Sequence, residues 1–326
     1  MKTPVYPLRF YPTYKDYLWG GDWIIRKYRR PMTPGVYAES WEVSDREDGM
    51  SMVSNGVWAG LPFKDLLKKH HTALLGPSAA TAALPLLIKL IDARERLSVQ
   101  VHPDDAAAAR YGGEAKTEMW YVLDATPDAG VYAGFKPGVT PEQFEQALRD
   151  KTVADLLQRH PVRPGDAVFI PGGRVHAIDA GCLLLEVQQN SNTTYRIYDW
   201  DRVDAEGNAR PLHLDAARQV INWNDSVVEL LRPSLIGEGK GWTHHQILDC
   251  PLFRMEKLSL NAAWTWRRKR PGFAVLFLQS GELDIIWSGR GEPLMTGDSA
   301  FLPAALSELQ LHPLTATAEV LLVDIP

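Results

Sequence analysis

An eight-residue pattern that occurs twice constrains the fold of this chain more than any other feature. Residues 164–171 read Pro-Gly-Asp-Ala-Val-Phe-Ile-Pro, and residues 296–303 read Thr-Gly-Asp-Ser-Ala-Phe-Leu-Pro. In each copy Gly-Asp favours a turn, and the apolar residues before the proline favour a short strand. The alternative is chance similarity, but Gly, Asp and Pro match in both copies. The repeat therefore predicts two related β-structures in one chain.

Most of the remaining sequence has the pattern of short strands separated by glycine and proline. Clear alternation of apolar and polar residues occurs at 97–102, 195–200 and 281–287. The spacing of apolar residues predicts helices at 62–75, 140–158 and 212–223. These patterns predict a mainly β fold, a sandwich or small barrel with a few added helices.

Composition limits the classes of function. The chain has 326 residues and a formal net charge of −5, which does not indicate binding to nucleic acid or to an anionic membrane. Its two cysteines, Cys182 and Cys250, are too few for a thiolate metal cluster or a disulfide framework. Residues 1–12 lack the apolar core of a signal peptide, and the most apolar window, 84–91, is too short to span a bilayer. We expect a cytoplasmic protein.

Four side chains suggest a metal site. Gln100 and His102 are two apart in a predicted strand, so they point to the same face. Glu118 lies in another strand-like stretch, and His176 follows a glycine turn at 171–175. If these strands are neighbours, two imidazoles, one carboxylate and one amide converge. That ligand set suits Zn²⁺ with water, and also Fe²⁺, Mn²⁺ or Co²⁺.

Each of these residues also has a structural interpretation. A histidine in a β-protein is more often structural than a ligand. Glu118 would then pair with Lys116 or Arg110, and Gln100 would be a hydrogen-bonded amide inside a barrel. In the second copy of the repeat, Glu308 stands where the first copy has His176, and no Gln-x-His precedes it. The sequence thus predicts that only the first β-structure keeps a metal site.

Two longer motifs are specific: Ser-Val-Gln-Val-His-Pro-Asp-Asp at 98–105 and Thr-Thr-Tyr-Arg at 193–196. With several other stretches, they resemble the short bacterial form of type I mannose-6-phosphate isomerase, a family of the cupin superfamily. The other matching stretches are 19–21, 39–44, 84–89, 116–121, 134–136, 170–178 and the remainder of 186–202. They cover most of residues 1–225 in family order.

The resemblance implies a zinc-dependent bicupin, that is, two jelly-roll-like β-barrels with one Zn²⁺ per chain. We expect a catalytic cupin domain at 1–242 and a degenerate cupin-like domain at 243–326. The implied metal ligands are His102, Glu118 and His176, with Gln100 as the fourth. The implied reaction interconverts mannose 6-phosphate and fructose 6-phosphate through an enediol.

The resemblance also places the catalytic arginine on Arg196 and a substrate-contacting lysine on Lys136. Asn192 stands where the family usually has Asp, so any role of that carboxylate is in doubt. From the residues alone, Arg196 either stabilises the enediolate, binds phosphate, or forms an ion pair with Glu186 or Asp199.

The proton acceptor is open among Glu186, Lys136 and a hydroxide on the metal. Trp19 and Ser40 are candidates for the pocket wall and for substrate contact. Two alternatives to the main hypothesis are another cupin enzyme acting on a sugar phosphate and a non-catalytic sugar-binding bicupin. The expected partner is a small sugar phosphate, with no nucleic acid or membrane, and the expected state is a monomer or weak homodimer.

Overall fold

The computed structural model describes residues 5–77, 81–225 and 228–325. The chain forms two compact units, and each unit is built from segments that are not consecutive in the sequence. Unit 1 comprises the residues up to Thr13, Trp41–Pro85 and the chain from Arg232 onward, whereas unit 2 comprises Tyr14–Ser40 and Leu86–Leu231. Within the described residues, no helix is long and apolar enough to cross a membrane.

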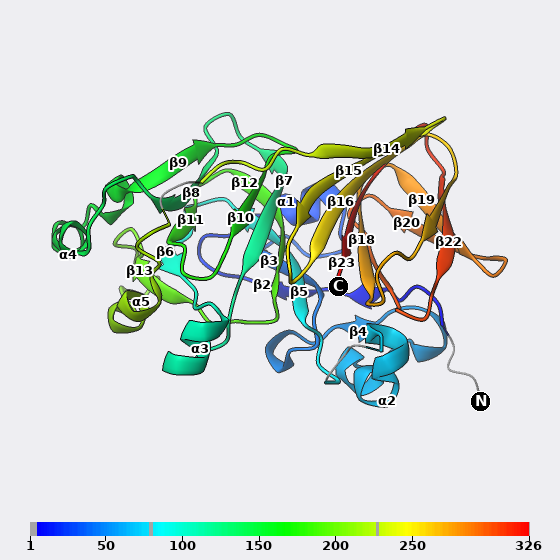
Figure 1. Ribbon diagram of the computed structural model, residues 1–326, viewed down its shortest axis with the longest axis horizontal. Helices are drawn as coiled ribbons and strands as arrows, with labels where there is room; N and C mark the ends of the chain where they lie inside the picture. Colours follow the sequence, from blue (N-terminus) through cyan, green and yellow to red (C-terminus); the bar gives the residue numbers. More distant parts are fainter. Residues whose placement is uncertain (1–4, 78–80, 226–227, 326) are drawn as a thin grey trace. The chain divides into compact units, whose positions relative to one another are not determined.

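Two antiparallel sheets form most of unit 2 (Figure 1). The six-stranded sheet has the order β10 (Ala167–Ile170), β7 (Glu118–Ala125), β12 (Cys182–Gln189), β5 (Leu86–Ala93), β3 (Glu39–Val43) and β2 (Thr13–Lys15). The five-stranded sheet has the order β13 (Tyr195–Tyr198), β6 (Val99–Val101), β11 (His176–Ile178), β8 (Gly130–Phe135) and β9 (Leu157–Pro161). Apolar residues of both sheets, among them Ile91, Trp120 and Val131, form one buried cluster, so the sheets face each other.

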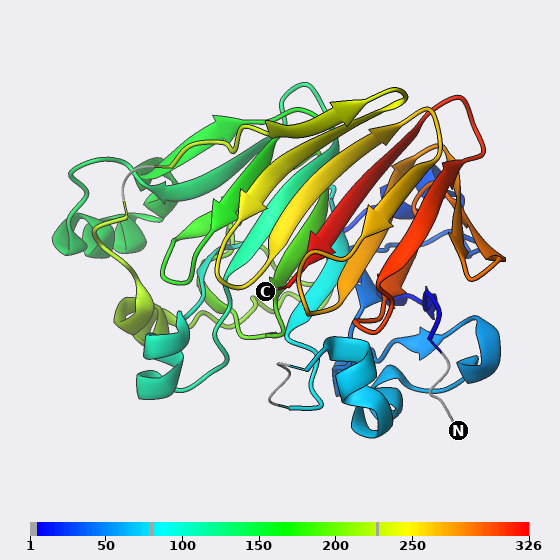
Figure 2. The ribbon, with the colours of Figure 1, turned by 45° about the vertical axis from the view of Figure 1, so that its right-hand side comes forward.

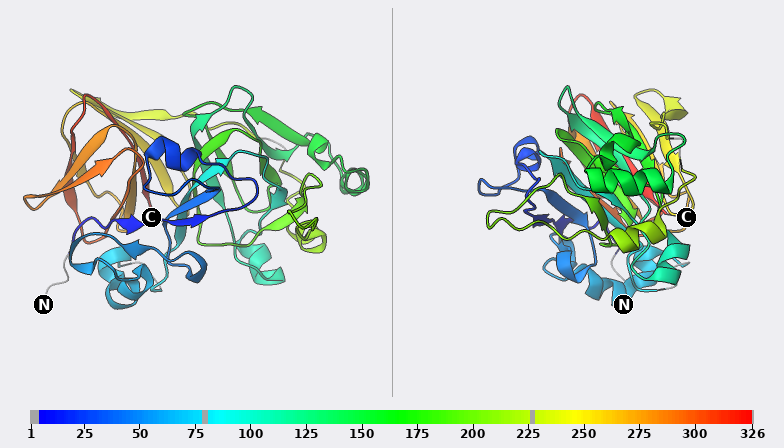
Figure 3. Two further views of the ribbon diagram at one scale, coloured as in Figure 1. Left: turned by 180° about the vertical axis from the view of Figure 1, so that it is seen from behind. Right: turned by 90° about the vertical axis from the view of Figure 1, so that its left-hand side faces the viewer.

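Helices cover the other face of the five-stranded sheet (Figure 3). These are α3 (Asp105–Tyr111), α4 (Pro141–Asp150) and α5 (Leu214–Val220). Phe144 of α4 and Ala217 of α5 pack with Val99 and Val101 of β6 in a second apolar cluster. The strand that carries Gln100 is therefore apolar on its helix side and polar on the opposite side. A further helix, α1 (Trp23–Tyr28), contacts β5.

Unit 1 contains a six-stranded and a four-stranded antiparallel sheet (Figure 2). The larger has the order β14 (Ser234–Gly239), β15 (Trp242–Asp249), β16 (Arg254–Leu260), β23 (Ala318–Asp324), β18 (Ala274–Ser280) and β21 (Ser299–Leu302). The smaller has the order β17 (Trp264–Arg267), β22 (Glu308–Pro313), β19 (Glu282–Trp287) and β20 (Arg290–Met295).

An aromatic cluster holds the remaining parts of unit 1 to its larger sheet. Phe10 of β1 (Phe10–Tyr11), which pairs with β4 (Met52–Val53), contacts Phe63 of α2 (Phe63–Leu75) at 4.7 Å between ring centres. Phe63 and Phe273 each lie about 5 Å from Phe301 of β21. The N-terminal residues and α2 thus share one core with strands that come much later in the chain.

The strand order of unit 1 repeats that of unit 2. Taken in chain order, β14 to β23 correspond one by one to β2, β3 and β5 to β12. Among the described strands, β13 of unit 2 and the pair β1 and β4 of unit 1 have no counterpart. The repeated sequence pattern occupies equivalent places, because β10 and β21 pair in the same register with β7 and β18. Gly165 and Gly297 open the two strands with positive φ values of 94° and 89°.

The prediction of a mainly β fold with added helices is confirmed. Among the described residues no sheet closes on itself by strand pairing, so the predicted barrels are not established by the topology. The expected domains 1–242 and 243–326 likewise stay a prediction.

The predicted helices exist, but two are shorter than expected. The helix at 62–75 is α2, and that at 212–223 is limited to α5. The helix expected at 140–158 ends at Asp150, because Lys151 adopts a left-handed conformation with φ of 59°. A 3-10 turn at Val153–Leu156 and strand β9 follow. Helices α1 and α3 were not predicted, although Asp104 caps α3 by accepting a hydrogen bond from the Ala107 amide at 2.7 Å.

Candidate metal site and cavity

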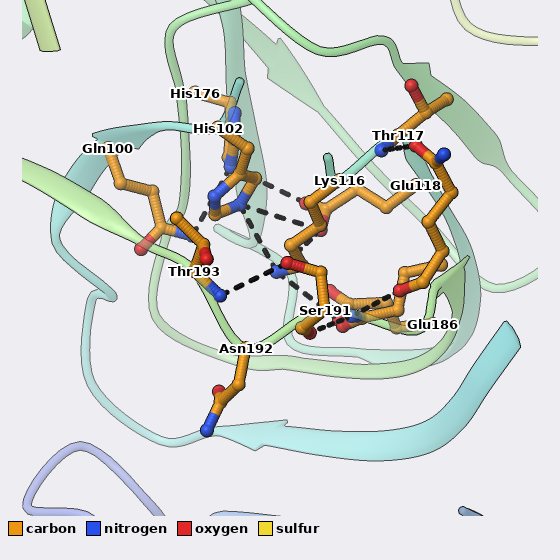
Figure 4. Close-up of polar contacts among 12 residues, drawn as sticks. Gln100, His102, Lys116, Thr117, Glu118, His176, Glu186, Ser191, Asn192 and Thr193 are labelled. Carbon is orange, nitrogen blue, oxygen red and sulfur yellow. Dashed lines mark hydrogen bonds and ion pairs between the residues drawn. The ribbon is translucent and has the colours of Figure 1, made fainter. Parts of the chain in front are cut away.

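Three strands of unit 2 bring His102, Glu118 and His176 together. His102 directly follows β6, His176 begins β11, and Glu118 begins β7 in the facing sheet. The pairing of β6 with β11 places His176 opposite Gln100. Figure 4 shows these side chains directed toward one another. We refer to His102, Glu118 and His176 as the ligand group, because a donor atom from each lies within 4.8 Å of the others.

The ligand group is buried and has the geometry of a metal site. Nε2 of His176 lies 3.4 Å from one Glu118 oxygen, and Nε2 of His102 lies 3.6 Å from the other. All three side chains are almost inaccessible to solvent. Within the described part of the chain, neither Glu118 oxygen accepts a hydrogen bond of good geometry, although the Lys116 ammonium lies 2.8 Å from one of them. Such a set of inward-facing acceptors fits a divalent cation.

A hydrogen bond determines which ring nitrogen of His176 carries the proton. Its Nδ1 lies 2.8 Å from the carbonyl oxygen of Arg174, which can only accept, so Nδ1 carries the proton. The lone pair of Nε2 therefore points into the ligand group, as metal coordination requires. Burial lowers the pKa of His176 to about 3 and that of His102 well below its usual value. Both imidazoles are neutral at physiological pH.

Two glycines join the segments that carry the histidines. The Gly173 amide donates to the carbonyl oxygen of His102 at 2.8 Å, and Gly173 has a φ of 89°. A Cβ on Gly172 would lie only 2.6 Å from Cα of Asp104, the residue two positions after His102. The turn before His176 therefore packs directly on the chain after His102, and no larger residue fits there.

A buried network of lysines and glutamates adjoins the ligand group. The Lys89 ammonium lies 2.9 Å from Glu186 and 3.3 Å from Glu39. Lys116 lies 3.2 Å from Nε2 of His102 and 4.0 Å from Glu186. Adjacent strands explain the arrangement, because Lys89 of β5 pairs directly with Glu186 of β12.

Burial and mutual attraction set the charges of this network. Burial alone would lower the pKa of Lys89, but Glu186 and Glu39 raise it above its usual value. Burial would likewise raise the pKa of Glu186, but Lys89 and Lys116 lower it, assisted by a 2.7 Å hydrogen bond from Nε1 of Trp120. Burial and the nearby Glu186 raise the pKa of Glu118 to about 7. Glu186 is thus the more acidic carboxyl of the two.

A cavity of about 260 Å³ opens beside the network. Its wall includes Gln100, Lys89, Lys116 and Glu186 from the site already described. The remaining lining residues are Tyr17, Trp19, Glu39, Ile91, Leu97, Ser98, Ile178, Asn192, Thr194, Arg196 and Arg210. The cavity therefore has acidic and basic groups next to the ligand group and arginines elsewhere in its wall.

Two arginines, Arg202 and Arg210, pair with Asp199 near Arg196. Arg202 and Arg210 each donate to Asp199 at 2.6 Å, and these bonds hold the pKa of Asp199 below its usual value against the effect of burial. Arg196 donates to the carbonyl oxygen of Pro211 at 2.8 Å, and its buried Nε has no hydrogen-bond partner among the described residues. Burial and the neighbouring Arg210 lower the pKa of Arg196. Arg202 also lies 4.0 Å from Glu95, so three guanidinium groups face two carboxylates and the region has one excess positive charge.

The structure brings most of the predicted site residues together. Trp19, Arg196 and Glu186 line the cavity, but Lys136 and Ser40 are not among its lining residues. Lys136 is exposed at the end of β8, where its ammonium donates to the carbonyl oxygen of Asp155 at 2.7 Å. Ser40 is fully buried in β3.

Four charged residues of the cavity were not predicted: Lys89, Lys116, Glu39 and Arg210. A signal was present for Lys89, which interrupts an otherwise apolar run from Leu84 to Ile91. A charged residue inside a strand buried along its whole length requires a partner. Arg210 had no comparable signal, because it lies in an irregular segment after β13.

The two facing sheets and the buried His–Glu–His group beside a polar cavity define a mainly β protein with a candidate divalent-metal site. A sequence model described as phosphomannose isomerase type I, catalytic domain, matches residues 8–137. The chain is 34% identical over 318 residues to the mannose-6-phosphate isomerase ManA of Bacillus subtilis, covering 94% of this chain and 96% of that protein. The chain belongs to the mannose-6-phosphate isomerase family.

Two further comparisons agree. The mannose-6-phosphate isomerase of Streptococcus mutans is 38% identical over 205 residues, which cover 63% of this chain and 64% of that protein. The crystal structure of the mannose 6-phosphate isomerase from Bacillus subtilis superposes with a TM-score of 0.89 at 28% identity, covering 98% of this chain and 99% of that one.

Proposed function

We propose that this protein interconverts mannose 6-phosphate and fructose 6-phosphate, through an enediol, in the cavity of unit 2. The observation that carries the proposal is the convergence of His102, Glu118 and His176 beside a cavity that has both acid–base groups and arginines. Aldose–ketose isomerisation moves a proton between adjacent carbons, which requires an electrophile, a proton acceptor and stabilisation of negative charge. Membership of the isomerase family supports the same substrate.

His102, Glu118 and His176 would hold one Zn²⁺, with Fe²⁺, Mn²⁺ or Co²⁺ as substitutes. Gln100 would be the fourth ligand through its amide oxygen. Its Nε2 lies 3.2 Å from Nε2 of His176, and rotation of the amide by 180° would present the oxygen there instead. These residues would thereby supply a Lewis acid, which would polarise an oxygen of the sugar and favour loss of the neighbouring proton.

Glu186 is the proton acceptor in this proposal. It lines the cavity, and the two lysines keep it ionised at neutral pH. The cluster contains three carboxyl groups and two ammonium groups, so when all are ionised it has one net negative charge. The carboxyl groups are those of Glu39, Glu118 and Glu186, and the ammonium groups are those of Lys89 and Lys116. A divalent ion would leave the cluster with one net positive charge, which matches a singly charged enediolate.

Arg196 would bind the phosphate or the developing anion. Its buried, unbonded Nε and the excess charge around Asp199 support this role. Trp19 would form part of the wall against the sugar. Lys136 and Ser40 stay predictions, because neither lines the cavity.

The matching strand orders support a bicupin. The bounds of the catalytic domain, 1–242, and of the degenerate domain, 243–326, stay a prediction from the sequence. Glu308 and Arg267 occupy the places of His176 and Gln100 in that second β-structure, since they pair in the same register. A cytoplasmic location, a monomer or weak homodimer, and the absence of nucleic-acid or membrane partners remain parts of the proposal that rest on the sequence.

The test is a coupled assay of the purified protein with mannose 6-phosphate, together with its metal content. We expect turnover that stops after chelation and returns with Zn²⁺. Protein that contains one metal ion per chain and does not convert mannose 6-phosphate would contradict the proposed reaction.

A further inference from the structure

A short loop between β12 and β13 forms part of the cavity wall. The loop spans residues 190–194, and its Asn192 and Thr194 line the cavity. Figure 4 shows the side chain of Asn192 directed away from the ligand group. Because the loop has no strand pairing of its own, other contacts must fix its position.

Glu114 makes contacts with three consecutive residues of this loop. Its carboxylate accepts a hydrogen bond from the Asn192 amide at 2.9 Å. Its own amide donates to the Thr193 hydroxyl at 2.9 Å, and its carbonyl oxygen accepts from the Ser191 hydroxyl at 3.0 Å. One residue thus bonds to polar groups at three consecutive positions of the loop.

Glu114 also lies close in sequence to the buried network. Lys116, two residues later, lines the cavity and lies beside both His102 and Glu118. The Lys116 amide donates to the carbonyl oxygen of Pro103 at 2.9 Å, which anchors this segment next to His102. Glu114 therefore links the segment that carries Lys116 to the loop that carries Asn192 and Thr194.

We propose that Glu114 is a positioning residue that sets the cavity wall formed by Asn192 and Thr194, and thereby the affinity for the sugar phosphate. This inference rests on the proposed isomerase function. The Glu114 side chain itself provides one of the three bonds, a charge-assisted one to a backbone amide, whereas the other two use its backbone. Replacing the side chain therefore loosens the loop without removing its other anchors.

The experiment compares Glu114→Ala with Glu114→Gln, which keeps an acceptor oxygen. For Glu114→Ala we expect KM for mannose 6-phosphate to rise about fivefold, the effect of losing one charge-assisted bond in a solvent-exposed place. We expect kcat to change less than KM, and metal content to be unchanged. Glu114→Gln should restore most of the affinity. Glu238→Ala, at an exposed glutamate of unit 1, is the matched control and should behave as wild type.

Amide hydrogen exchange gives a second measurement that does not depend on turnover. Exchange at Asn192 should be faster in Glu114→Ala than in wild type or Glu114→Gln. Unchanged exchange and KM in Glu114→Ala, or equal losses in both variants, would overturn the inference. If wild type fails to isomerise mannose 6-phosphate, the proposed reaction fails, and the exchange measurement alone decides whether Glu114 positions the loop.

Discussion

The two units of this protein have sheets with the same strand order but different chemistry at equivalent places. The five-stranded sheet of unit 2 and the four-stranded sheet of unit 1 differ only by β13. Equivalent strand positions are given by the pairings: Glu118 corresponds to Ala274, His176 to Glu308, Gln100 to Arg267 and Lys89 to Glu256. A shared topology is therefore compatible with the presence or the loss of a metal-binding group.

The two residues of unit 1 that stand in place of Gln100 and His176 pair with each other. Arg267 and Glu308 form an ion pair at 2.7 Å, with 73% and 53% of their side chains exposed. At the place equivalent to Glu308, His176 is fully buried. The strand that unit 1 lacks, β13, is also the one that carries Arg196. The comparison teaches that the two units differ by a few inward side chains and one added strand, and the proposed function assigns its chemistry to these.

The largest effect is expected from replacing a member of the ligand group. His176→Ala should lower isomerase activity roughly 10⁴-fold and abolish metal binding, since Lewis-acid stabilisation of several kcal/mol is lost. Glu308→Ala, the equivalent change in unit 1, should leave both unchanged. Metal analysis and the coupled assay measure the two effects. Full activity in metal-free His176→Ala protein would break the comparison.

Removing the buried Lys89 should lower the stability of the protein. Lys89→Met removes the ammonium that lies 2.9 Å from Glu186 and 3.3 Å from Glu39, so the free energy of unfolding should fall by about 3–5 kcal/mol. The equivalent change in unit 1, Glu256→Gln, keeps a polar partner for His244, which lies 2.9 Å away, and should cost about 1–3 kcal/mol. Urea denaturation gives both values, and equal losses would show that the two networks contribute alike.

The added strand can be tested through its arginine. Arg196→Ala should keep the metal and lose roughly 100-fold in kcat/KM, because a partly buried contact to an anion is removed. Arg267→Ala in unit 1 breaks only an exposed ion pair and should change activity and stability little. If Arg196→Ala retained full kcat/KM with mannose 6-phosphate, Arg196 would have a structural role only.

The smallest effect is a pH dependence of stability that comes from β5. Burial raises the pKa of Asp92 from 3.8 to about 6, although the Trp23 amide donates to it at 2.5 Å. The folded protein therefore binds more protons than the unfolded chain between about pH 4 and 6. The Asp92 contribution to stability then falls as pH rises through this window. Ser259, a neutral residue, occupies the equivalent place in β16.

Asp92→Asn should remove this dependence. We expect the difference in unfolding free energy between wild type and Asp92→Asn to shift by about 2 kcal/mol from pH 4 to pH 7. Urea denaturation at several pH values measures the difference. A difference that stays constant with pH would show that Asp92 does not titrate in this window.

The sequence predicted the features that depend on local pattern and on residue type. Period-two alternation placed Gln100 and His102 on one face, and the repeat at residues 165 and 297 marked equivalent strands. Pairing between distant strands was not predictable, because it depends on register and not on local preference. The contact of Lys89 with Glu186 is of this kind.

The ends of helices and some residues that line the cavity could also not be predicted from the sequence. The early end of α4 at Asp150 depends on the left-handed Lys151, a conformation that a lysine rarely adopts. Lys136 donates to the carbonyl oxygen of Asp155 outside the cavity lining, and its contact with substrate stays a prediction. Irregular segments such as the one carrying Arg210 take their path from tertiary contacts, which leave no periodic signal.

The glycine turn before His176 couples the two imidazoles mechanically. Because Gly172 touches Asp104 and the Gly173 amide is hydrogen-bonded to the carbonyl oxygen of His102, the backbones of the two histidine segments pack directly against each other. The distance between the two imidazoles thus depends on the backbone of the glycine turn. A larger residue at Gly172 would therefore change the distance between the two histidine segments.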